Sequence, residues 1–446
     1  MKRFDAAVLT TDPARRTFLL DVGIAALAAV DPVASINRVV SRRGGGLAIG
    51  EGFLSLDGLG RCVVLGFGKA SVGMGRAVAA MLGDLPTTGI LVTNEAGELA
   101  PFEVVEAGHP VPDERSVSAG HRVLEAAHGT GPRDLVIVLI SGGGSALLTV
   151  PAAGLTLQDL AESNAALLRS GAPIAALNTV RKHLSAVKGG RLAAALSDAG
   201  AVVTLVLSDV VGNSLSTIAS GPMVADGTTF DDALAVLEEY GVSAVVPPAV
   251  LHHLEAGSRG EISDTPVDGT VFDQQMIAIV GDARVAAEAA SAYANESGRR
   301  ARVVTSALEG EASDVARRIV GEARSLVSGE LLVYAGETTV TVKGKGVGGR
   351  NQELALAASI EMDGDDGLVL MSLGTDGIDG MNPAAGAFAD GSSVSRGRNL
   401  GLDARDSLER NDSHTYLSAI GDTVVCGPTG TNVGDIILVY RSGDRG

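Results

Sequence analysis

The chain has no tryptophan, and aromatic residues make up only 3% of its 446 residues. Its core must therefore be built mainly from Ala, Val, Leu and Ile, as in sheets that are covered on both faces. The two cysteines, Cys62 and Cys426, cannot form a disulfide framework, and as buried thiols they fit a reducing compartment. No run reaches the roughly 18 unbroken apolar residues of a membrane span, and residues 18–30 predict an amphipathic helix rather than a signal peptide. A cytoplasmic protein that does not enter a membrane is therefore expected.

Positive charge is also scarce, because 35 Lys and Arg residues stand against 53 Asp and Glu residues, for a formal net charge of −18. Such a field repels nucleic acids and anionic membrane surfaces, so neither is expected as a partner. The few basic residues that lie in glycine-rich loops become candidates for local anion sites. Glycine itself is abundant, with 59 residues, most of them clustered between apolar runs.

A chain of this length is too long for one hydrophobic core, so at least two domains are expected. Short β-branched runs alternate with Ala- and Leu-rich helical patterns, which predicts α/β layers of parallel strands with the ligand-binding loops on one edge. A polar stretch after Pro247 and Pro248 predicts a boundary, with domains at residues 1–250 and 270–446. Strands are expected at residues 62–65, 90–93, 103–106, 135–140, 202–207, 276–280, 302–305, 331–334, 368–373 and 436–440. Helices are expected at residues 74–81, 114–127, 157–168, 282–295 and 352–360.

Two glycine-rich loops directly follow predicted strands. In the first, Gly66-Phe67-Gly68-Lys69-Ala70-Ser71, the glycines permit close backbone approach, and the following helix N-terminus attracts anions. It lacks the Walker A spacing, and Ser71 stands where the dinucleotide pattern has its last glycine, so NAD(P) binding and a simple turn both stay open. The second loop is Ser141-Gly142-Gly143-Gly144-Ser145, which offers N–H groups and two hydroxyls to a phosphate or carboxylate. It does not fit a nucleophile elbow, and a purely structural turn is the alternative.

A basic segment follows at residues 178–191. On a helix, Asn178, Arg181 and Ser185 would share one face because they are three and four residues apart. Lys188 comes three residues later, just before two glycines that are typical of a helix end. In a chain this acidic the cluster indicates anion binding, although a solvated basic face would have the same pattern.

Acidic residues follow strands at two further places. Asp209 lies at the carboxyl end of the predicted strand at 202–207, after Ser208, where it could bind Mg²⁺ or accept a hydroxyl proton, or simply cap a helix. Asp376 and Asp379 lie between glycines after the strand at 368–373 and could hold a metal or substrate hydroxyls.

Polar residues also gather around a candidate arginine. Glu337 and Thr338 follow the strand at 331–334, and Arg350 and Asn351 follow a pair of glycines. Arg350 could present its guanidinium to a carboxylate or to a phosphoryl group in transfer.

Taken together and in this order, these segments resemble the class II glycerate 2-kinases, whose C-terminal part is known as the MOFRL domain. The resemblance runs from about residue 15 to residue 440. The matching text includes Gly68-Lys69-Ala70-Ser71, His109-Pro110-Val111-Pro112-Asp113, Ser141 to Ser145, Asn178 to Gly190, Ser208-Asp209, Ala219-Ser220-Gly221-Pro222, Gly336-Glu337-Thr338-Thr339, Gly349-Arg350-Asn351-Gln352-Glu353, Thr375-Asp376-Gly377-Ile378-Asp379 and Gly427 to Val433.

The resemblance implies two α/β domains, the larger Rossmann-like with a mostly parallel sheet, and an active site in the cleft between them. It implies Mg²⁺-dependent transfer of the γ-phosphoryl group of ATP to the 2-hydroxyl of D-glycerate. Lys69 and Arg350 would contact substrate and phosphoryl group, and Asp209 would be a metal ligand or proton acceptor. The residues expected to bind substrate or phosphate are Ser141, Gly142, Gly143, Gly144, Ser145, Asn178, Arg181, Lys188, Glu337, Thr338, Asn351, Asp376 and Asp379.

The chain departs from the family pattern at two positions. Asn213 stands where the family usually has Asp, and an Asn carbonyl would hold Mg²⁺ more weakly than a carboxylate. Ala335 replaces a common glycine. A kinase for another short sugar acid therefore stays open, as does an NAD(P)-dependent hydroxypyruvate reductase, since family members carry that label. A nucleotide-binding protein without turnover is a further alternative. Glycerate and ATP are the expected small-molecule partners, and a homodimer is conceivable.

Overall fold

A computed structural model describes residues 11–442. These residues form two compact α/β units, and neither of them is continuous in the chain. The parallel-sheet unit comprises Ser35–Ser208 and Asn213–Val280. The mixed-sheet unit comprises the described residues up to Ala34, the short segment Asp209–Gly212 and the residues from Gly281 onward. The division expected from the sequence, 1–250 and 270–446, instead follows the chain without interruption.

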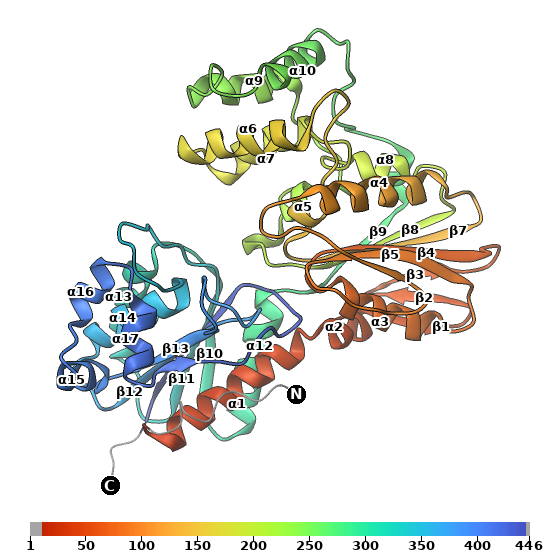
Figure 1. Cartoon of the computed structure of the whole chain (residues 1–446). Coiled ribbons are helices and arrows are strands. Elements are labelled where there is room, and N and C mark those ends of the chain that lie inside the picture. Colours follow the sequence, from red (N-terminus) through yellow and green to blue (C-terminus); the bar gives the residue numbers. More distant parts are fainter. Residues whose placement is uncertain (1–10, 443–446) are drawn as a thin grey trace. The chain divides into compact units, whose positions relative to one another are not determined.

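The parallel-sheet unit is built on six strands in the order β6–β5–β4–β7–β8–β9 (Figure 1). Adjacent strands from β6 to β8 pair in parallel. Figure 1 shows α3 on one face of this sheet and α4 and α8 on the other. β7 is buried along its whole length, which accounts for its nearly unbroken apolar sequence. The strands are β4 (Arg61–Phe67), β5 (Thr87–Thr93), β6 (Glu103–Glu106), β7 (Asp134–Ile140), β8 (Ala201–Leu207) and β9 (Met276–Gly281).

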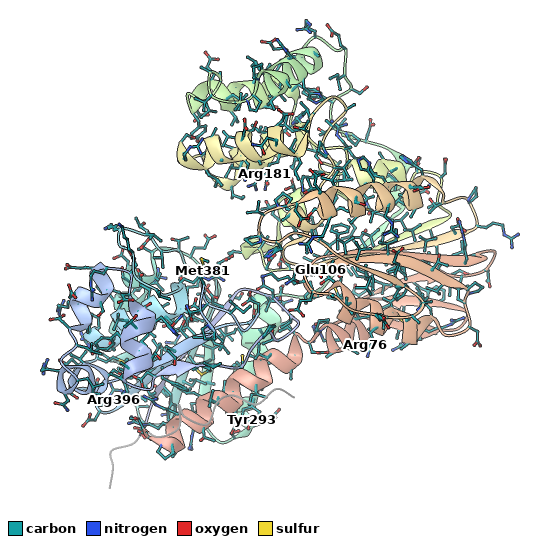
Figure 2. The ribbon with its side chains drawn as sticks, viewed as in Figure 1. Arg76, Glu106, Arg181, Tyr293, Met381 and Arg396 are labelled. Carbon is teal, nitrogen blue, oxygen red and sulfur yellow. The ribbon has the colours of Figure 1, made fainter. Side chains whose placement is uncertain are left out.

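The helices of this unit include a layer of their own. Four of them, α6 (Leu157–Arg169), α7 (Ile174–His183), α9 (Phe230–Glu239) and α10 (Pro248–Ser258), pack around a shared apolar cluster centred on Phe230. Arg181 lies on α7 in this layer (Figure 2). The other helices are α2 (Pro32–Val39), α3 (Ser71–Leu82), α4 (Glu114–His128), α5 (Gly144–Leu147), α8 (Arg191–Ala195) and α11 (Thr270–Gln274). A small antiparallel sheet joins β1 (Val40–Arg43), β2 (Gly46–Ile49) and β3 (Gly52–Ser55).

The mixed-sheet unit has the strand order β10–β11–β15–β12–β13–β14. Only β10 and β11 pair in parallel, and the remaining neighbours are antiparallel. The strands are β10 (Arg300–Leu308), β11 (Glu330–Gly336), β12 (Leu368–Gly374), β13 (Gly386–Asp390), β14 (Thr423–Val424) and β15 (Asp435–Arg441). The helices are α1 (Pro13–Ala29), α12 (Ala283–Glu296), α13 (Ala312–Ala323), α14 (Arg350–Glu361), α15 (Ser393–Asn399), α16 (Ala404–Glu409) and α17 (Ser413–Ala419).

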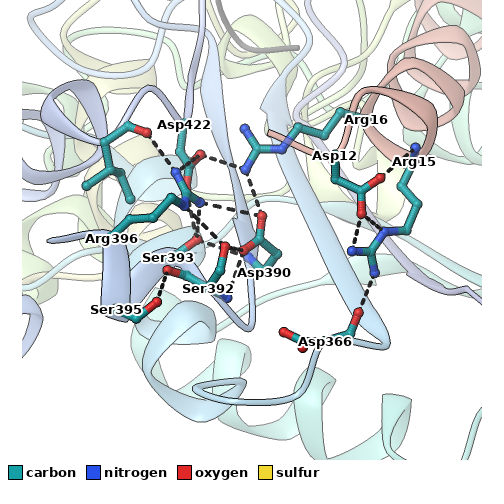
Figure 3. Close-up of polar contacts among 11 residues, drawn as sticks. Asp12, Arg15, Arg16, Asp366, Asp390, Ser392, Ser393, Ser395, Arg396 and Asp422 are labelled. Atoms are coloured by element: carbon teal, nitrogen blue, oxygen red, sulfur yellow. Dashed lines mark hydrogen bonds and ion pairs between the residues drawn. The ribbon is translucent and has the colours of Figure 1, made fainter. Parts of the chain in front are cut away.

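Helix α1 belongs to the mixed-sheet unit because a fully buried arginine holds it there. Arg16 donates from Nη2 to Asp390 Oδ2 at 2.8 Å and to Asp422 Oδ1 at 2.6 Å (Figure 3). Arg396 binds the other oxygen of Asp422 at 2.7 Å, so the two acids and two arginines compensate one another. Although burial opposes the charge, bonds from Ser392 and Arg16 lower the pKa of Asp390 to about 2. The partners of these ion pairs lie nearly 400 residues apart in the chain, so no local sequence pattern indicates them. A division into two contiguous domains therefore could not assign α1 to the C-terminal one.

The fold class expected from the sequence is confirmed: two α/β domains, of which one has a parallel sheet. All ten expected strands are present as β4–β12 and β15, and all five expected helices are present as α3, α4, α6, α12 and α14. The expectation of parallel layers throughout fails in the mixed-sheet unit. There β15 inserts between β11 and β12, and β13 returns antiparallel to β12 without a crossover helix. No single helix among the described residues is long and apolar enough to cross a membrane.

Candidate functional site

Two predicted loops of the parallel-sheet unit meet at the carboxyl ends of neighbouring strands. β4 and β7 pair in register up to Phe67 and Ile140, so the loops that follow them begin side by side. Lys69 N donates to Gly142 O at 2.9 Å, and Ala70 N donates to Ser141 Oγ at 3.0 Å. The Lys69 loop and the 141–145 loop are therefore one hydrogen-bonded structure.

Glycine is required in both loops by close approach as well as by backbone angle. Gly68 has φ +128°, and a Cβ there would lie 2.2 Å from Ser141 Oγ. Gly143 has φ +82°, and a Cβ there would lie 2.8 Å from His109 Cδ2 and 3.5 Å from Lys69 Cγ. The Lys69 side chain thus runs beside Gly143, over the loop that was predicted to bind phosphate.

Two backbone donors of this loop are left for a ligand. Within the part of the chain that the structure describes, the N–H groups of Gly142 and Gly143 have no acceptor. Successive N–H groups next to a left-handed residue form a concavity that suits an anion. The Ser141 hydroxyl, by contrast, is already bound to Ala70 N and has a structural task.

A buried polar network joins three further predicted residues, Ser145, Asn178 and Lys188. Lys188 Nζ donates to Ser145 O at 2.6 Å and to Ser145 Oγ at 3.0 Å. Ser145 Oγ lies 3.0 Å from Ser220 Oγ, which donates to Asn178 Oδ1 at 3.0 Å. The network ties α7, the turn after it and α5 together, so it fixes the far end of the 141–145 loop.

Arg181 and Lys188 are cations without an acidic partner. Lys188 is buried and binds only neutral oxygens, and Arg181 Nε donates to Asn164 Oδ1 at 2.8 Å. Neither forms an ion pair with any residue in the described range 11–442. Burial, and after it the charge of Arg181, lower the pKa of Lys188 to about 7. Burial lowers the pKa of Arg181 as well. A bound anion would favour the charged forms of both side chains.

In the mixed-sheet unit, Arg350 is held by two acids. It opens α14, and its Nε and Nη2 donate to Asp435 Oδ2 and Oδ1 at 2.7 and 3.0 Å. Its Nη1 donates to Glu337 Oε1. Burial by itself lowers the pKa of Arg350, but the carboxylates of Asp435 and Glu337 raise it above its ordinary value. Arg350 therefore stays charged, in a fixed orientation, within a group whose net charge is negative.

Asp379 is placed under the N-terminus of α14. Its carboxylate accepts from the backbone N–H groups of Asn351 and Gln352, at 3.0 and 2.9 Å, and from both side-chain amides. Gly349 permits this approach, because a Cβ there would lie 2.4 Å from Asp379 Cγ. With its oxygens engaged and its side chain buried, Asp379 is suited to capping the helix and positioning Arg350, which is a different task from the substrate contact expected of it.

The other expected acids and amides are distributed over both units. Asp209 groups with the mixed-sheet unit, where its Oδ2 accepts from Asn432 Nδ2 at 3.2 Å. Burial raises the pKa of Glu337, and the charges of Asp435 and Asp209 add to that effect. Asn213 lies in the parallel-sheet unit, in a left-handed conformation with φ +55° that Asn tolerates.

The remaining two expected residues lie in loops of the mixed-sheet unit. Thr338 is buried in the segment that follows β11, and Asp376 Oδ1 accepts from Ile378 N at 3.1 Å. Among residues 11–442, no three His, Cys, Asp or Glu side chains gather as a metal centre would. Mg²⁺ held by one or two carboxylates and by substrate phosphates needs no such group, and the adjacent acids Asp209 and Glu337 fit that mode.

Several residues of these clusters were not among the expected site residues. Asp435 is the first residue of β15. An acid at the end of a strand is often exposed to solvent, so the sequence did not indicate that Asp435 belongs to the site. Asn164 lies in the middle of α6 without any motif. Ser220 and His109 lie in segments that match the family pattern described above, and this match could have identified them as site residues.

Comparisons with known proteins agree with this arrangement. The family described as a domain of unknown function (DUF4147) matches residues 18–255, more than half of the chain. The MOFRL family matches residues 330–435. The first match spans the 141–145 loop and its network, and the second spans the Arg350 cluster.

Named relatives align with most of the chain. The D-glycerate 2-kinase of Thermotoga maritima is 41% identical over 395 residues, which cover 86% of this chain and 91% of that protein. A relative from Agrobacterium vitis, named provisionally as a hydroxypyruvate reductase, is 42% identical and covers 95% of this chain and 94% of its own length. The crystal structure of glycerate kinase from Thermotoga maritima superposes with a TM-score of 0.83 at 36% identity, covering 96% of this chain and 99% of that one. The chain therefore belongs to the glycerate kinase family, whose members join an N-terminal DUF4147 domain to a C-terminal MOFRL domain.

Proposed function

We propose that this protein is a glycerate 2-kinase, which transfers the γ-phosphoryl group of ATP to the 2-hydroxyl of D-glycerate. The observation that carries the proposal is a pair of basic side chains without an acidic partner among the described residues: Lys188, which binds Ser145 of the 141–145 loop, and Arg181, whose charge acts on Lys188. In a chain with a formal charge of −18, two acid-free cations are best explained by an anionic ligand. The names of the Thermotoga maritima relatives give the reaction and the substrate.

Phosphoryl transfer depends on positioning and on neutralising oxyanion charge more than on covalent chemistry. The unpaired N–H groups of Gly142 and Gly143 supply neutral donors, and Lys69 runs beside them. Lys188 acts through Ser145, since its three N–H groups are engaged by Ser145 and Leu148. We assign phosphate binding to the loop, to Arg181 and to Lys69, and positioning to Lys188.

The Arg350 cluster has the opposite charge balance and therefore a different task. A guanidinium has five N–H groups, and three of those of Arg350 bind Asp435 and Glu337. The others remain for the substrate carboxylate or the transferred phosphoryl group. Because the cluster as a whole is negative, Asp209 and Glu337 would hold Mg²⁺ together with ATP phosphates or accept the hydroxyl proton. Mg²⁺, when bound, would shield the phosphate charge from the attacking hydroxyl.

The kinase reading is tested by following ADP release from ATP and D-glycerate, and in parallel NADH oxidation with hydroxypyruvate. Arg181→Gln should lower kcat/KM by about 100-fold because charge stabilisation is lost. Lys188→Met should lower it by about as much because it releases Ser145 and with it the end of the loop. Arg76→Gln, at an exposed arginine of α3 (Figure 2), is the matched control and should change kcat/KM less than about twofold.

Two outcomes would contradict the proposal. NADH consumption without ADP release would assign the protein to the reductases, as the name of the Agrobacterium vitis relative suggests. Near-normal turnover in both Arg181→Gln and Lys188→Met would remove the cationic pair from the reaction. A screen of short hydroxy acids by ADP release would identify the acceptor if D-glycerate is inactive.

A further inference from the structure

A cavity of about 670 Å³ lies in the parallel-sheet unit, between the end of α4, α8 and α10. Its volume is that of a typical small-molecule site. The walls are mostly small and apolar, with Leu124, Ala153, Ala195 and Ile262 among them. None of the residues assigned above to phosphate or substrate lines it.

One strongly basic group, Arg191, lines this cavity. Arg191 is the first residue of α8, and its Nε is buried without a hydrogen-bond partner among the described residues. Burial lowers its pKa, while the charges of Asp264 and Asp226 act in the other direction without pairing with it. A guanidinium does not deprotonate in proteins, so an unpaired one at a cavity wall is costly unless a ligand completes it.

The remaining polar groups of the cavity leave this charge largely unopposed. His253 Nε2 donates to His183 O at 3.0 Å, and burial lowers its pKa, which favours the neutral ring. The hydroxyl of Ser185 already accepts from Val187 N and Lys188 N. The acid of the cavity lining, Asp198, is exposed to solvent and forms no ion pair with Arg191.

We propose that this cavity binds a small organic anion, with a single carboxylate or phosphate group on an apolar body. The anionic group pairs with Arg191, whose planar fork matches both chemistries. The apolar body lies against the alanine and leucine wall. The site is separate from the residues proposed for the kinase reaction, so its test does not depend on the proposed function.

The test uses three probes that share one apolar ring: benzoate, phenyl phosphate and the uncharged benzamide. Isothermal titration calorimetry at pH 7 on the full chain should show binding of at least one anion, with benzamide at least about tenfold weaker, since the uncharged amide cannot form the charge-assisted bond to Arg191. Arg191→Met should weaken the anion by about tenfold or more. Ala195→Leu, which fills the cavity without altering charge, should do the same.

The controls separate this cavity from the other cationic region. Arg76→Gln should leave the affinity for the probe unchanged, and so should Arg181→Gln. Loss of binding in Arg181→Gln with retention in Arg191→Met would place the probe at the proposed phosphate site and overturn the inference. Equal affinity for benzoate and benzamide, or no binding of either anion, would also overturn it. Thermal unfolding of each variant verifies that it is folded.

Discussion

Replacing Asp435 by Asn should uncouple Arg350 from its support at almost no change in volume. Asp435 is 1% exposed, and one of its oxygens accepts from both Arg350 Nη2 and Asn351 Nδ2 while the other accepts from Arg350 Nε. An amide has one acceptor oxygen and one NH₂ group, so in either orientation at least one donor faces another donor. The substitution also leaves Glu337 as the one ion-pair partner of Arg350 among the described residues.

The expected cost follows from these contacts. Each lost charge-assisted hydrogen bond is worth about 1.5–3 kcal/mol, and removing one member of a buried ion pair costs about 3–5 kcal/mol. Because a third of the Arg350 side chain is exposed, at 33%, solvent compensates part of the loss. We expect the local free energy of opening around α14 and β15 to fall by about 3 kcal/mol, and kcat/KM to fall by more than about tenfold through misorientation of Arg350.

The assay is hydrogen exchange of peptides from α14 and β15, combined with steady-state ADP release. A local measurement is needed because a chain of two units does not unfold in one step. Asp314→Asn is the control, at an acid that is 66% exposed and pairs with Arg317 within one helix turn, and it should change stability by less than about 0.5 kcal/mol. If Asp435→Asn matched this control in both assays, Asp435 would not be what orients Arg350.

Four further outcomes are expected. The pKa of Lys188 is lowered to about 7 in the folded protein, from an ordinary value of 10.5. Between these two values the unfolded chain binds more protons than the folded one, so Lys188 makes the protein more stable as pH rises through this window. Urea titrations at pH 7 and 9.5 should show this rise in the free energy of unfolding, and Lys188→Met should lack it. Lys69→Ala should lower kcat/KM by more than about 100-fold with an unchanged unfolding midpoint; activity within a few-fold would exclude Lys69 from the site. Asn213→Asp should lower the Mg²⁺ concentration for half-maximal rate if that position faces the metal, and an unchanged Mg²⁺ titration would remove it. Arg16→Met should destabilise the mixed-sheet unit by about 3–5 kcal/mol, because the buried acids Asp390 and Asp422 then share one arginine. Calorimetry that shows no loss of stability would contradict the role given to Arg16 in holding α1.

The sequence predicted those parts of the fold that have a local cause. Apolar β-branched runs such as Val63-Val64-Leu65 form central strands because helices cover both faces of their sheet. The position of β15 between β11 and β12 has no such cause, since its partners lie about 100 and 70 residues away in the chain. The strands β1–β3, β13 and β14 were missed for another reason: with two to five residues each, they are too short to show a pattern.

The candidate site shows the same division between local and distant causes. The glycine pattern of the 141–145 loop predicted an anion cradle, and the structure leaves two N–H groups there without an acceptor. The helical face expected for residues 178–188 was only half right, because α7 ends at His183 and Lys188 reaches Ser145 from the turn beyond it. Asp435 could not be foreseen, since nothing near it in sequence shows that Arg350, 85 residues earlier, lies beside it.

The two clusters have opposite charge balances. Arg181 and Lys188 have no acidic partner among the described residues; burial lowers the pKa of both, and the charge of Arg181 lowers that of Lys188 further. Around Arg350 the acids exceed the bases, so that region attracts a cation and repels a bare phosphate. Each cluster by itself therefore favours a partner of opposite charge: an anion for Arg181 and Lys188, and a cation for the acids around Arg350. Phosphoryl transfer uses a partner of each kind, a phosphate and Mg²⁺, and this is the argument from charge for the function proposed above.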